Sequence, residues 1–297
     1  MIFRTCVLIL SLVLFLGATN GCQNQFKPEI VSHNNSLLWQ ISKKGSPTSY
    51  MYGTMHMINK EYYNLSDNLK SIINSSETVI MELGGMPNPI QAMLLMTNKS
   101  GSLKDLFSPD EWQVILDFYK KEFNMGENQF IRTYNSFKPF FLFQSLTQAY
   151  FEADAESYDM NIMQIAKEQN KSLVGLETIA QQIRFFDTIP DSEMAKLILE
   201  SIKNYEQDKI DFSKLEQLYS AEKIDELIPL MKEQSPEFLK YEDIFLTNRN
   251  KVWIPKLKSL LSEKTCFVAV GAAHLYNNEG LISLLKQEGY TLVPLKK

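Results

Sequence analysis

Two short stretches near opposite ends of the chain decide its fold. Residues 265–274 read TCFVAVGAAH, and residues 49–56 read SYMYGTMH. Each is an apolar or aromatic run typical of a buried strand, followed by glycine, two residues and histidine. Sites in open α/β sheets form beyond the carboxyl ends of strands, where glycine permits sharp turns and close backbone approach. The pattern therefore predicts His56 and His274 together at one edge of a sheet.

The residues that follow each histidine match as well. After His56, Ser66 is placed to cap a helix with apolar residues at 69, 72 and 73, and a strand follows at 78–81. After His274, leucines at 281, 284 and 285 repeat that face, Gly289 is placed to end the helix, and a strand follows at 290–293. Each strand–GxxH–helix–strand unit is a βαβ unit with parallel strands. We therefore expect an α/β fold whose mixed, largely parallel sheet is built from two βαβ-containing halves.

Helical segments separate the two halves. Ser108 and Glu111 form a capping box around a proline, and further helices are expected to open at Pro139 and Pro190. We expect large helical inserts at about residues 86–150 and 190–262. The apolar stretch 87–96 is predicted to be helical core, and the alternative is a lid or a substrate groove.

Two carboxylates share the placement of the histidines. The strand at 78–81 ends at Glu82, and a strand at 172–176 ends at Glu177. Parallel strands would bring all four side chains to one rim of the sheet. Two histidines with one or two carboxylates suit a first-row divalent metal with an open position. They suit equally a metal-free general base paired with an orienting acid, and the residues alone leave both open.

Composition excludes several other functions. The chain of 297 residues has 30 Lys and Arg against 35 Asp and Glu, for a formal charge of -5. It has no basic surplus to hold a phosphate backbone, so we expect no nucleic-acid partner. It also contains no GxSxG or CxxC sequence, which disfavours a nucleophile elbow and a thioredoxin-like site.

The N-terminus has the pattern of an export signal. Arg4 precedes an apolar run at 6–16 that is too short to span a bilayer, and small and polar residues then lead to Cys22. This resembles a bacterial lipoprotein signal, which implies a signal peptide at 1–21 and a lipid anchor on Cys22. The alternative is an ordinary signal peptide with Cys22 free. We expect a polar tether at 22–36, which contains His33, and a protein anchored to a membrane of the cell envelope.

Three blocks of the sequence resemble the TraB/GumN family, which includes the Tiki proteins. The first comprises LWQI at 38–41, YGTMH at 52–56 and MEL at 81–83. The second runs from Asp159 to GLET at 175–178, and the third comprises RN at 249–250 and FVAVGAAHL at 267–275. The resemblance extends over about residues 37–295, so we expect one domain at 37–297.

The resemblance implies a fold related to erythromycin esterases and ChaN-like lipoproteins. It also implies an enzyme whose site is built from both histidines, one strand-end glutamate and an arginine, which are here His56, Glu82, Arg249 and His274. In a Tiki-like hydrolase, His56, Glu82 and His274 would hold Mn, Co or Zn, with Glu177 as a further candidate ligand or a supporting acid. Arg249 would stabilise the developing oxyanion.

The expected activity is metal-dependent peptide hydrolysis at a membrane surface. Asp159 is expected to support Glu177 or to cap its own helix. One alternative is a metal-independent esterase that uses the same residues on small esters, and the other is a non-enzymatic lipoprotein that binds haem or metal. The chain departs from the family at Gly84, where many relatives have Asp, and at Ala273, where glycine is frequent. Nothing in the sequence indicates the oligomeric state.

Overall fold

The computed structural model describes residues 35–86, 88–99, 101–234 and 240–297. The expected signal peptide, Cys22 and His33 lie outside these ranges. Within them, no helix is both long enough and apolar enough to cross a bilayer.

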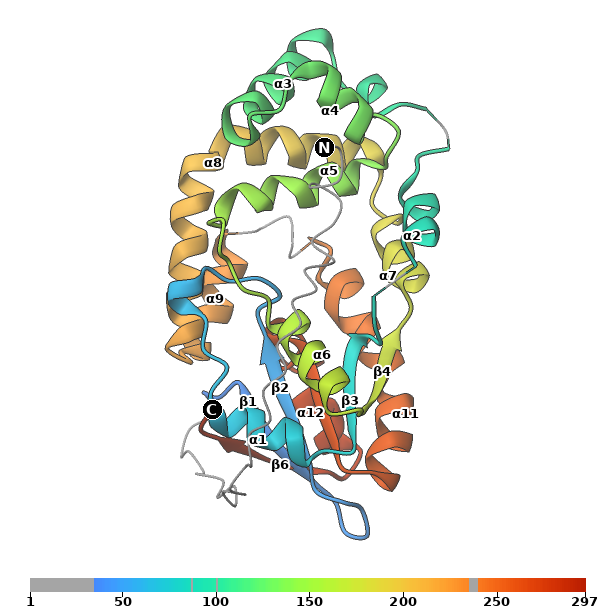
Figure 1. Ribbon diagram of the computed structural model, residues 1–297, viewed down its shortest axis with the longest axis vertical. Helices are drawn as coiled ribbons and strands as arrows, with labels where there is room; N and C mark the ends of the chain where they lie inside the picture. The colour runs from blue at the N-terminus through green and yellow to red at the C-terminus, as the bar shows by residue number, and fades with distance from the viewer. Residues whose placement is uncertain (1–34, 87, 100, 235–239) are drawn as a thin grey trace.

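A sheet of six strands forms the base of the molecule (Figure 1). Its spatial order is β4-β3-β5-β2-β1-β6. The first four strands of this order are parallel, and β1 is antiparallel to both of its neighbours. The predicted class, a mixed and largely parallel α/β sheet, is therefore confirmed. The strands are β1 (Leu38–Ser42), β2 (Ser49–Thr54), β3 (Thr78–Leu83), β4 (Ser172–Glu177), β5 (Cys266–Gly271) and β6 (Thr291–Leu295).

Both predicted strand–helix–strand units are present. The first is β2–α1–β3, and the side chain of Ser66 accepts a hydrogen bond from Leu69 N at the start of α1 (Asp67–Ser75). The second is β5–α12–β6, and α12 (Leu281–Gln287) ends shortly before Gly289, whose φ is +82°. The two strands of each unit run in the same direction but are not neighbours. Strand β5 lies between β2 and β3, and β2 and β1 lie between β5 and β6. This interleaving places the two GxxH motifs on adjacent strands.

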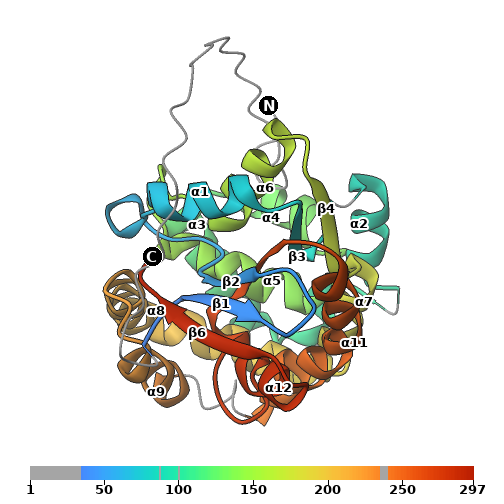
Figure 2. The same ribbon diagram turned by 90° about the horizontal axis from the view of Figure 1, so that it is seen from below.

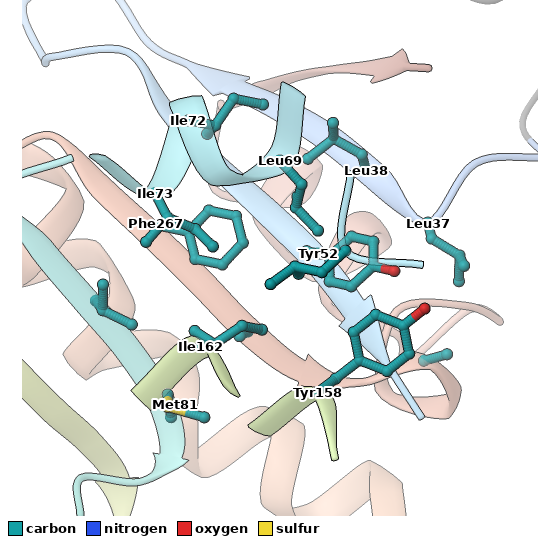
Figure 3. Packing of buried hydrophobic residues seen from close by; sticks show 14 of the residues in the cluster. Leu37, Leu38, Tyr52, Leu69, Ile72, Ile73, Met81, Tyr158, Ile162 and Phe267 are labelled. Carbon is teal, nitrogen blue, oxygen red and sulfur yellow. The ribbon is translucent and has the colours of Figure 1, made fainter. Parts of the chain in front are cut away.

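Helices cover both faces of the sheet (Figure 2). On one face, α1 and α6 (Tyr158–Glu168) enclose an apolar core that includes Tyr52, Ile162 and Phe267 (Figure 3). On the other face, α12 and α11 (Asn248–Glu263) enclose a core around Trp253. Since both faces are covered, every residue of β5 is buried, as expected for a strand inside a parallel sheet.

A helical region with a core of its own lies above the sheet in Figure 1. Helix α8 joins the two regions: Met194 and Ile198 belong to the helical core, whereas Tyr219 donates a hydrogen bond to Gly53 O in the sheet. The elements of this region and its connections are η2 (Leu103–Leu106), α3 (Pro109–Phe123), α4 (Glu127–Tyr134), α5 (Pro139–Leu146), η3 (Thr147–Tyr150), α7 (Ile179–Phe186), α8 (Asp191–Ser220) and α9 (Ile224–Gln234). The predicted capping box opens α3, with both hydrogen bonds formed. Together these helices confirm the expectation that the α/β fold carries large helical inserts.

Helix α2 (Pro89–Met96) departs from expectation. It was predicted to be core, but none of its residues is buried, and Ile90, Met93 and Leu94 are 67%, 53% and 61% exposed. The helix packs against α7 near the carboxyl ends of β3 and β4 and is not enclosed by either sheet core. The prediction was wrong because apolar composition indicates burial only where another element covers the helix.

Candidate active site

The glycine of each GxxH motif allows the two motifs to pack against each other. A Cβ on Gly53 would lie 3.0 Å from Cα of Ala272 in the second motif. A Cβ on Gly271 would lie 3.3 Å from Glu82 Oε1 and 3.4 Å from His56 Nε2. Neither glycine has a positive φ. Close approach is therefore the reason for glycine at both positions, and a left-handed turn is not.

His56 is the exposed histidine, with 64% of its side chain accessible to solvent. Its Nδ1 hydrogen-bonds to Asp159 Oδ2 from the first turn of α6, and Thr54 Oγ1 donates to the other carboxylate oxygen at 3.2 Å. A carboxylate only accepts, so Nδ1 carries the proton and Nε2 is directed away from Asp159. Asp159 raises the pKa of His56 from 6.5 to about 9, although desolvation opposes this. Asp159 thus supports His56. The sequence had instead suggested Glu177 as the residue that Asp159 supports.

Glu82 is buried at the end of β3 and lies between the two histidines. Its Oε1 accepts a hydrogen bond from Gly271 N at 2.9 Å and lies 3.9 Å from His56 Nε2 and 3.7 Å from His274 Nε2. Its Oε2 accepts from Arg249 Nη2 at 2.5 Å. Burial opposes the charged form, yet the neighbouring His274, His56 and Arg249 hold the pKa of Glu82 well below its usual range. Glu82 is therefore an ionised carboxylate at neutral pH.

His274 is the buried histidine, only 3% exposed, in the short helix η5 (Ala272–His274). The side chain of Asn250 is oriented by donating to two backbone oxygens, those of His274 at 3.2 Å and Glu279 at 2.9 Å. Asn250 Oδ1 therefore accepts from His274 Nδ1 at 2.7 Å, which leaves the lone pair on Nε2. Burial lowers the pKa of His274 from 6.5 to about 3, and Arg249 adds to this effect. His274 is consequently neutral at neutral pH.

Arg249 joins these groups from helix α11 and is 6% exposed. Its Nε donates to Glu177 Oε2 at 3.2 Å, and its Nη2 donates to Glu177 Oε1 and Glu82 Oε2, both at 2.5 Å. Its Nη1 donates to Phe245 O at 2.9 Å and to His274 Nε2 at 3.1 Å. These acceptors use all five N–H groups of a guanidinium. No N–H is left for the predicted contact with an oxyanion, and Arg249 instead assembles the site.

The segment before Arg249 is a π-helix, η4 (Asp243–Thr247). Such wide turns are rare and occur frequently at functional sites. Its Phe245 carbonyl accepts one of the arginine hydrogen bonds, and Trp253, one turn after Arg249, donates from Nε1 to Glu177 Oε2 at 3.3 Å. Sequence periodicity indicated a helix in this region. It could not predict the π-helix, nor the residues that Asn250 and Trp253 contact.

The predicted metal ligands meet, but Arg249 engages most of their donor atoms. Among the residues that the structure describes, no group of three or more His, Cys, Asp or Glu side chains is arranged to hold a metal ion. Glu82 Oε2, both Glu177 oxygens and His274 Nε2 all accept from Arg249, so a metal would have to displace the guanidinium. The arrangement as it stands does not fit a Mn, Co or Zn ion, and the predicted metal stays a prediction.

Gly84 leaves no room for the acidic side chain that relatives have there. A Cβ at this position would lie 2.3 Å from Gly175 N on the neighbouring strand. Backbone packing between the residue after β3 and strand β4 therefore requires glycine, and a second acidic ligand is absent at Gly84 for a steric reason.

The structure thus brings five predicted residues to one rim of the sheet and adds three that were given other roles or none. The predicted residues are His56, Glu82, Glu177, Arg249 and His274, and the others are Asp159, Asn250 and Trp253. A helix from each face of the sheet contributes, α6 through Asp159 and α11 through Arg249. Cys22, the predicted lipid anchor, lies outside the described residues.

The sequence is similar to a known family over most of its length. The model of the TraB/PrgY/gumN family matches residues 37–294. A protein of Amphimedon queenslandica named "Metalloprotease TIKI homolog" is 32% identical over 83 residues, which are 28% of this chain and 16% of that protein. No solved structure matches. Because the family model matches most of the length of this chain, the chain belongs to the TraB/PrgY/gumN family.

Proposed function

We propose that this protein is a hydrolase that cleaves ester or peptide bonds, with His56 as the group that transfers protons. The observation that carries the proposal is the pairing of His56 Nδ1 with Asp159, which leaves Nε2 of this largely exposed side chain without a hydrogen-bond partner among the described residues, 3.9 Å from Glu82 Oε1. An imidazole oriented by a carboxylate on one nitrogen and open to water on the other is the arrangement of a general base.

The reaction follows from this geometry. The base is the neutral form of His56, which predominates above its pKa of about 9. In this form Nε2 takes a proton from water as the water oxygen forms a bond to the carbonyl carbon of the substrate. Asp159 and Glu82 stabilise the imidazolium that forms, since both carboxylates face the ring. Collapse of the tetrahedral intermediate breaks the bond to the leaving alkoxide or amine, which receives the proton from Nε2.

His274 supports the reaction without exchanging protons. Its side chain is buried, its Nε2 accepts from Arg249, and its pKa is lowered to about 3. A base this weak, without access to water, is a poor acceptor for a proton from water. His274 and Arg249 instead hold Glu82 in place, because Arg249 bridges His274 Nε2 and Glu82 Oε2.

Membership of the family and the name of the Amphimedon queenslandica protein support peptide bonds as substrates. A metal-dependent peptidase is the second candidate. One observation favours it: Glu82 Oε1 lies within 3.9 Å of Nε2 of both histidines. Removal of metal distinguishes the two candidates.

The test is hydrolysis by the purified protein of p-nitrophenyl acetate and of a peptide pool, before and after EDTA. We expect activity to survive EDTA and to fall by about 10²- to 10⁴-fold in His56→Ala. Gln287→Ala, on the exposed end of α12, is the control and should leave the rate unchanged. Unchanged activity in His56→Ala would refute the proposal. Loss in EDTA with recovery in Mn, Co or Zn would establish the metal-dependent candidate, and haem binding without hydrolysis would establish a carrier.

We also propose that the protein is held at a membrane of the cell envelope by lipid on Cys22. The support is the order of Arg4, the apolar run at 6–16 and the small residues before Cys22. Labelled palmitate should be incorporated into the expressed full chain and not into Cys22→Ala. Equal labelling of the two proteins would contradict the anchor.

A further inference from the structure

Helix α2 has an apolar face that the described part of the chain leaves uncovered. Ile90, Met93 and Leu94 lie at i, i+3 and i+4, the spacing of one helix face, and each is more than half exposed. Figures 1 and 2 both show α2 at the edge of the molecule. Large apolar side chains grouped on a surface mark a site of contact with a partner or a membrane.

The free charges around this face are positive. Residues 83–104 contain no Asp or Glu, although the whole chain carries 35 acidic residues and a formal charge of -5. Asp187, which follows α7, is paired with Lys138 at 2.7 Å. Three exposed cations near α2 form no ion pair with an acid among the described residues. They are Lys99 after α2, Arg184 on α7, against which α2 packs, and Lys256, which lines the same cleft as the start of α2.

An anionic membrane surface matches this combination of an apolar face and free cations. A helix at a bilayer surface buries apolar side chains at the boundary of headgroups and acyl chains, and nearby Lys and Arg attract anionic headgroups. A second copy of the chain matches less well. Two copies in contact through the same face would bring Lys99 and Arg184 of each close to those of the other, and like charges oppose such a contact.

The course of the chain agrees with a membrane on this side of the fold. Leu37 O accepts a hydrogen bond from Gly53 N at 2.8 Å, near the carboxyl end of β2. Helix α2 extends from the carboxyl end of β3, and β2 and β3 run in the same direction. The chain that leads to Cys22 therefore joins the fold at the edge of the sheet from which α2 extends.

We propose that α2 lies in the surface of a membrane that contains anionic lipid. Its three exposed apolar side chains lie among the acyl chains, and Lys99, Arg184 and Lys256 lie at the headgroups. Because β3 carries Glu82 at the same edge of the sheet, this contact brings the candidate active site close to the membrane. The contact is separate from the lipid proposed on Cys22 and does not depend on the proposed hydrolysis.

The test must report on α2 itself, because the apolar run at 6–16 or a lipid would hold every variant at a vesicle. Met93→Cys is introduced into the full chain together with Cys6→Ser and Cys22→Ser, and the new thiol is labelled with the fluorophore NBD. Cys266 does not react, because it is buried and burial raises the pKa of its thiol to about 11.

The matched control is Val114→Cys in the same background. Val114 is an apolar residue of α3 that is 48% exposed, against 53% for Met93, and it lies in the helical region away from the cationic residues. Both labelled proteins are mixed with vesicles of phosphatidylcholine and phosphatidylglycerol, and with vesicles of phosphatidylcholine alone. A lipid with a doxyl group on its acyl chain quenches any label that enters the bilayer.

We expect quenching of the label at residue 93 in the anionic vesicles and none at residue 114. Quenching should be largely lost in phosphatidylcholine alone or at high salt, because the headgroup attraction is electrostatic. Lys99→Gln with Arg184→Gln should weaken insertion by about fivefold for each cation removed. Lys44→Gln with Lys203→Gln, two exposed lysines on other elements, should leave it unchanged.

Three results would overturn the proposal. They are an unquenched label at residue 93 in anionic vesicles, equal quenching at residue 114, and quenching that is indifferent both to anionic lipid and to Lys99→Gln with Arg184→Gln. A change in the fluorescence at residue 93 with protein concentration, in the absence of vesicles and with no quenching in their presence, would assign the apolar face to a second copy of the chain.

Discussion

The two GxxH motifs occupy equivalent places in the fold and yet have opposite chemistry. His56 follows β2, is largely exposed and has a pKa raised to about 9. His274 follows the adjacent strand β5, is buried and has a pKa lowered to about 3. Neighbouring carboxylic or imidazole groups whose pKa values are driven apart in this way are commonly assigned different roles in catalysis.

The difference arises from the helices that pack on opposite faces of the sheet. Helix α6 presents Asp159 to Nδ1 of His56, and an anion favours the charged imidazolium. Burial is the main cause of the lowered pKa of His274, and it outweighs the opposing charge of Glu82. Helix α11 adds Arg249 at Nε2, a cation that disfavours the imidazolium, and a neutral amide, Asn250, at Nδ1. A repeated sequence motif therefore specifies where a histidine lies but not what it does. Five substitutions test this contrast.

Removal of Arg249, on the buried side of the site around His274, should have the largest effect of these substitutions on stability. Arg249→Ala leaves Glu82 and Glu177 buried without their cation, and breaking a buried ion pair lowers the free energy of unfolding by about 3–5 kcal/mol. Urea denaturation followed by circular dichroism measures the change. Lys251→Ala is the control, since its pair with Glu279 at 3.2 Å is exposed and worth at most about 1 kcal/mol. Equal losses in the two variants would mean that the Arg249 network does not stabilise the fold.

Alanine at each histidine should separate activity from stability. His56→Ala should lower kcat/KM by about 10²- to 10⁴-fold, because it removes the proton-transfer group. His274→Ala should instead lower the free energy of unfolding by about 1–3 kcal/mol, because Asn250 Oδ1 loses its buried donor. Ester hydrolysis and urea denaturation of both variants measure the contrast. It fails if His274→Ala is as stable as the wild type or if His56→Ala is fully active.

Asn250→Asp should make the surroundings of His274 resemble those of His56. A carboxylate at this position faces Nδ1 of His274 as Asp159 faces Nδ1 of His56. The pKa of His274 should then rise from about 3, by about 1–3 units for a close opposite charge. Titration of the histidine ring protons by NMR measures this shift, and the His56 signal in the same spectra is the internal reference. An unchanged His274 pKa would show that burial alone controls this group.

Asp159→Asn should have the smallest effect, a shift in the pH dependence. Because the neutral form of His56 is the base, kcat/KM should increase with pH until the pKa of His56, about 9, is passed. Without the Asp159 charge that pKa falls toward 6.5, so the increase should be complete at a lower pH. A pH–rate profile for ester hydrolysis measures the shift. A rate that declines through this range in the wild type would identify His56 as an acid and not a base.

Local patterns predicted most elements of the sheet. The strands at 49–52, 78–81 and 290–293 and the helix capped by Ser66 all appear close to their predicted positions. These patterns succeed because strand and helix periodicity is read over a few residues. They could not predict that β5 would insert between β2 and β3, because strand order depends on contacts between segments far apart in the chain. Strand β1 and the exposure of α2 were missed for the same reason.

By itself, the sequence determined that His56, Glu82, Glu177 and His274 lie at the ends of strands, because strand ends, glycines and caps are local features. Only the tertiary structure decided their partners. The pairing of His56 with Asp159, the five acceptors around Arg249 and the tautomer set by Asn250 depend on which helix covers which face. A pKa is determined by the charges and burial within a few ångströms of the group, and packing brings those neighbours from distant parts of the chain.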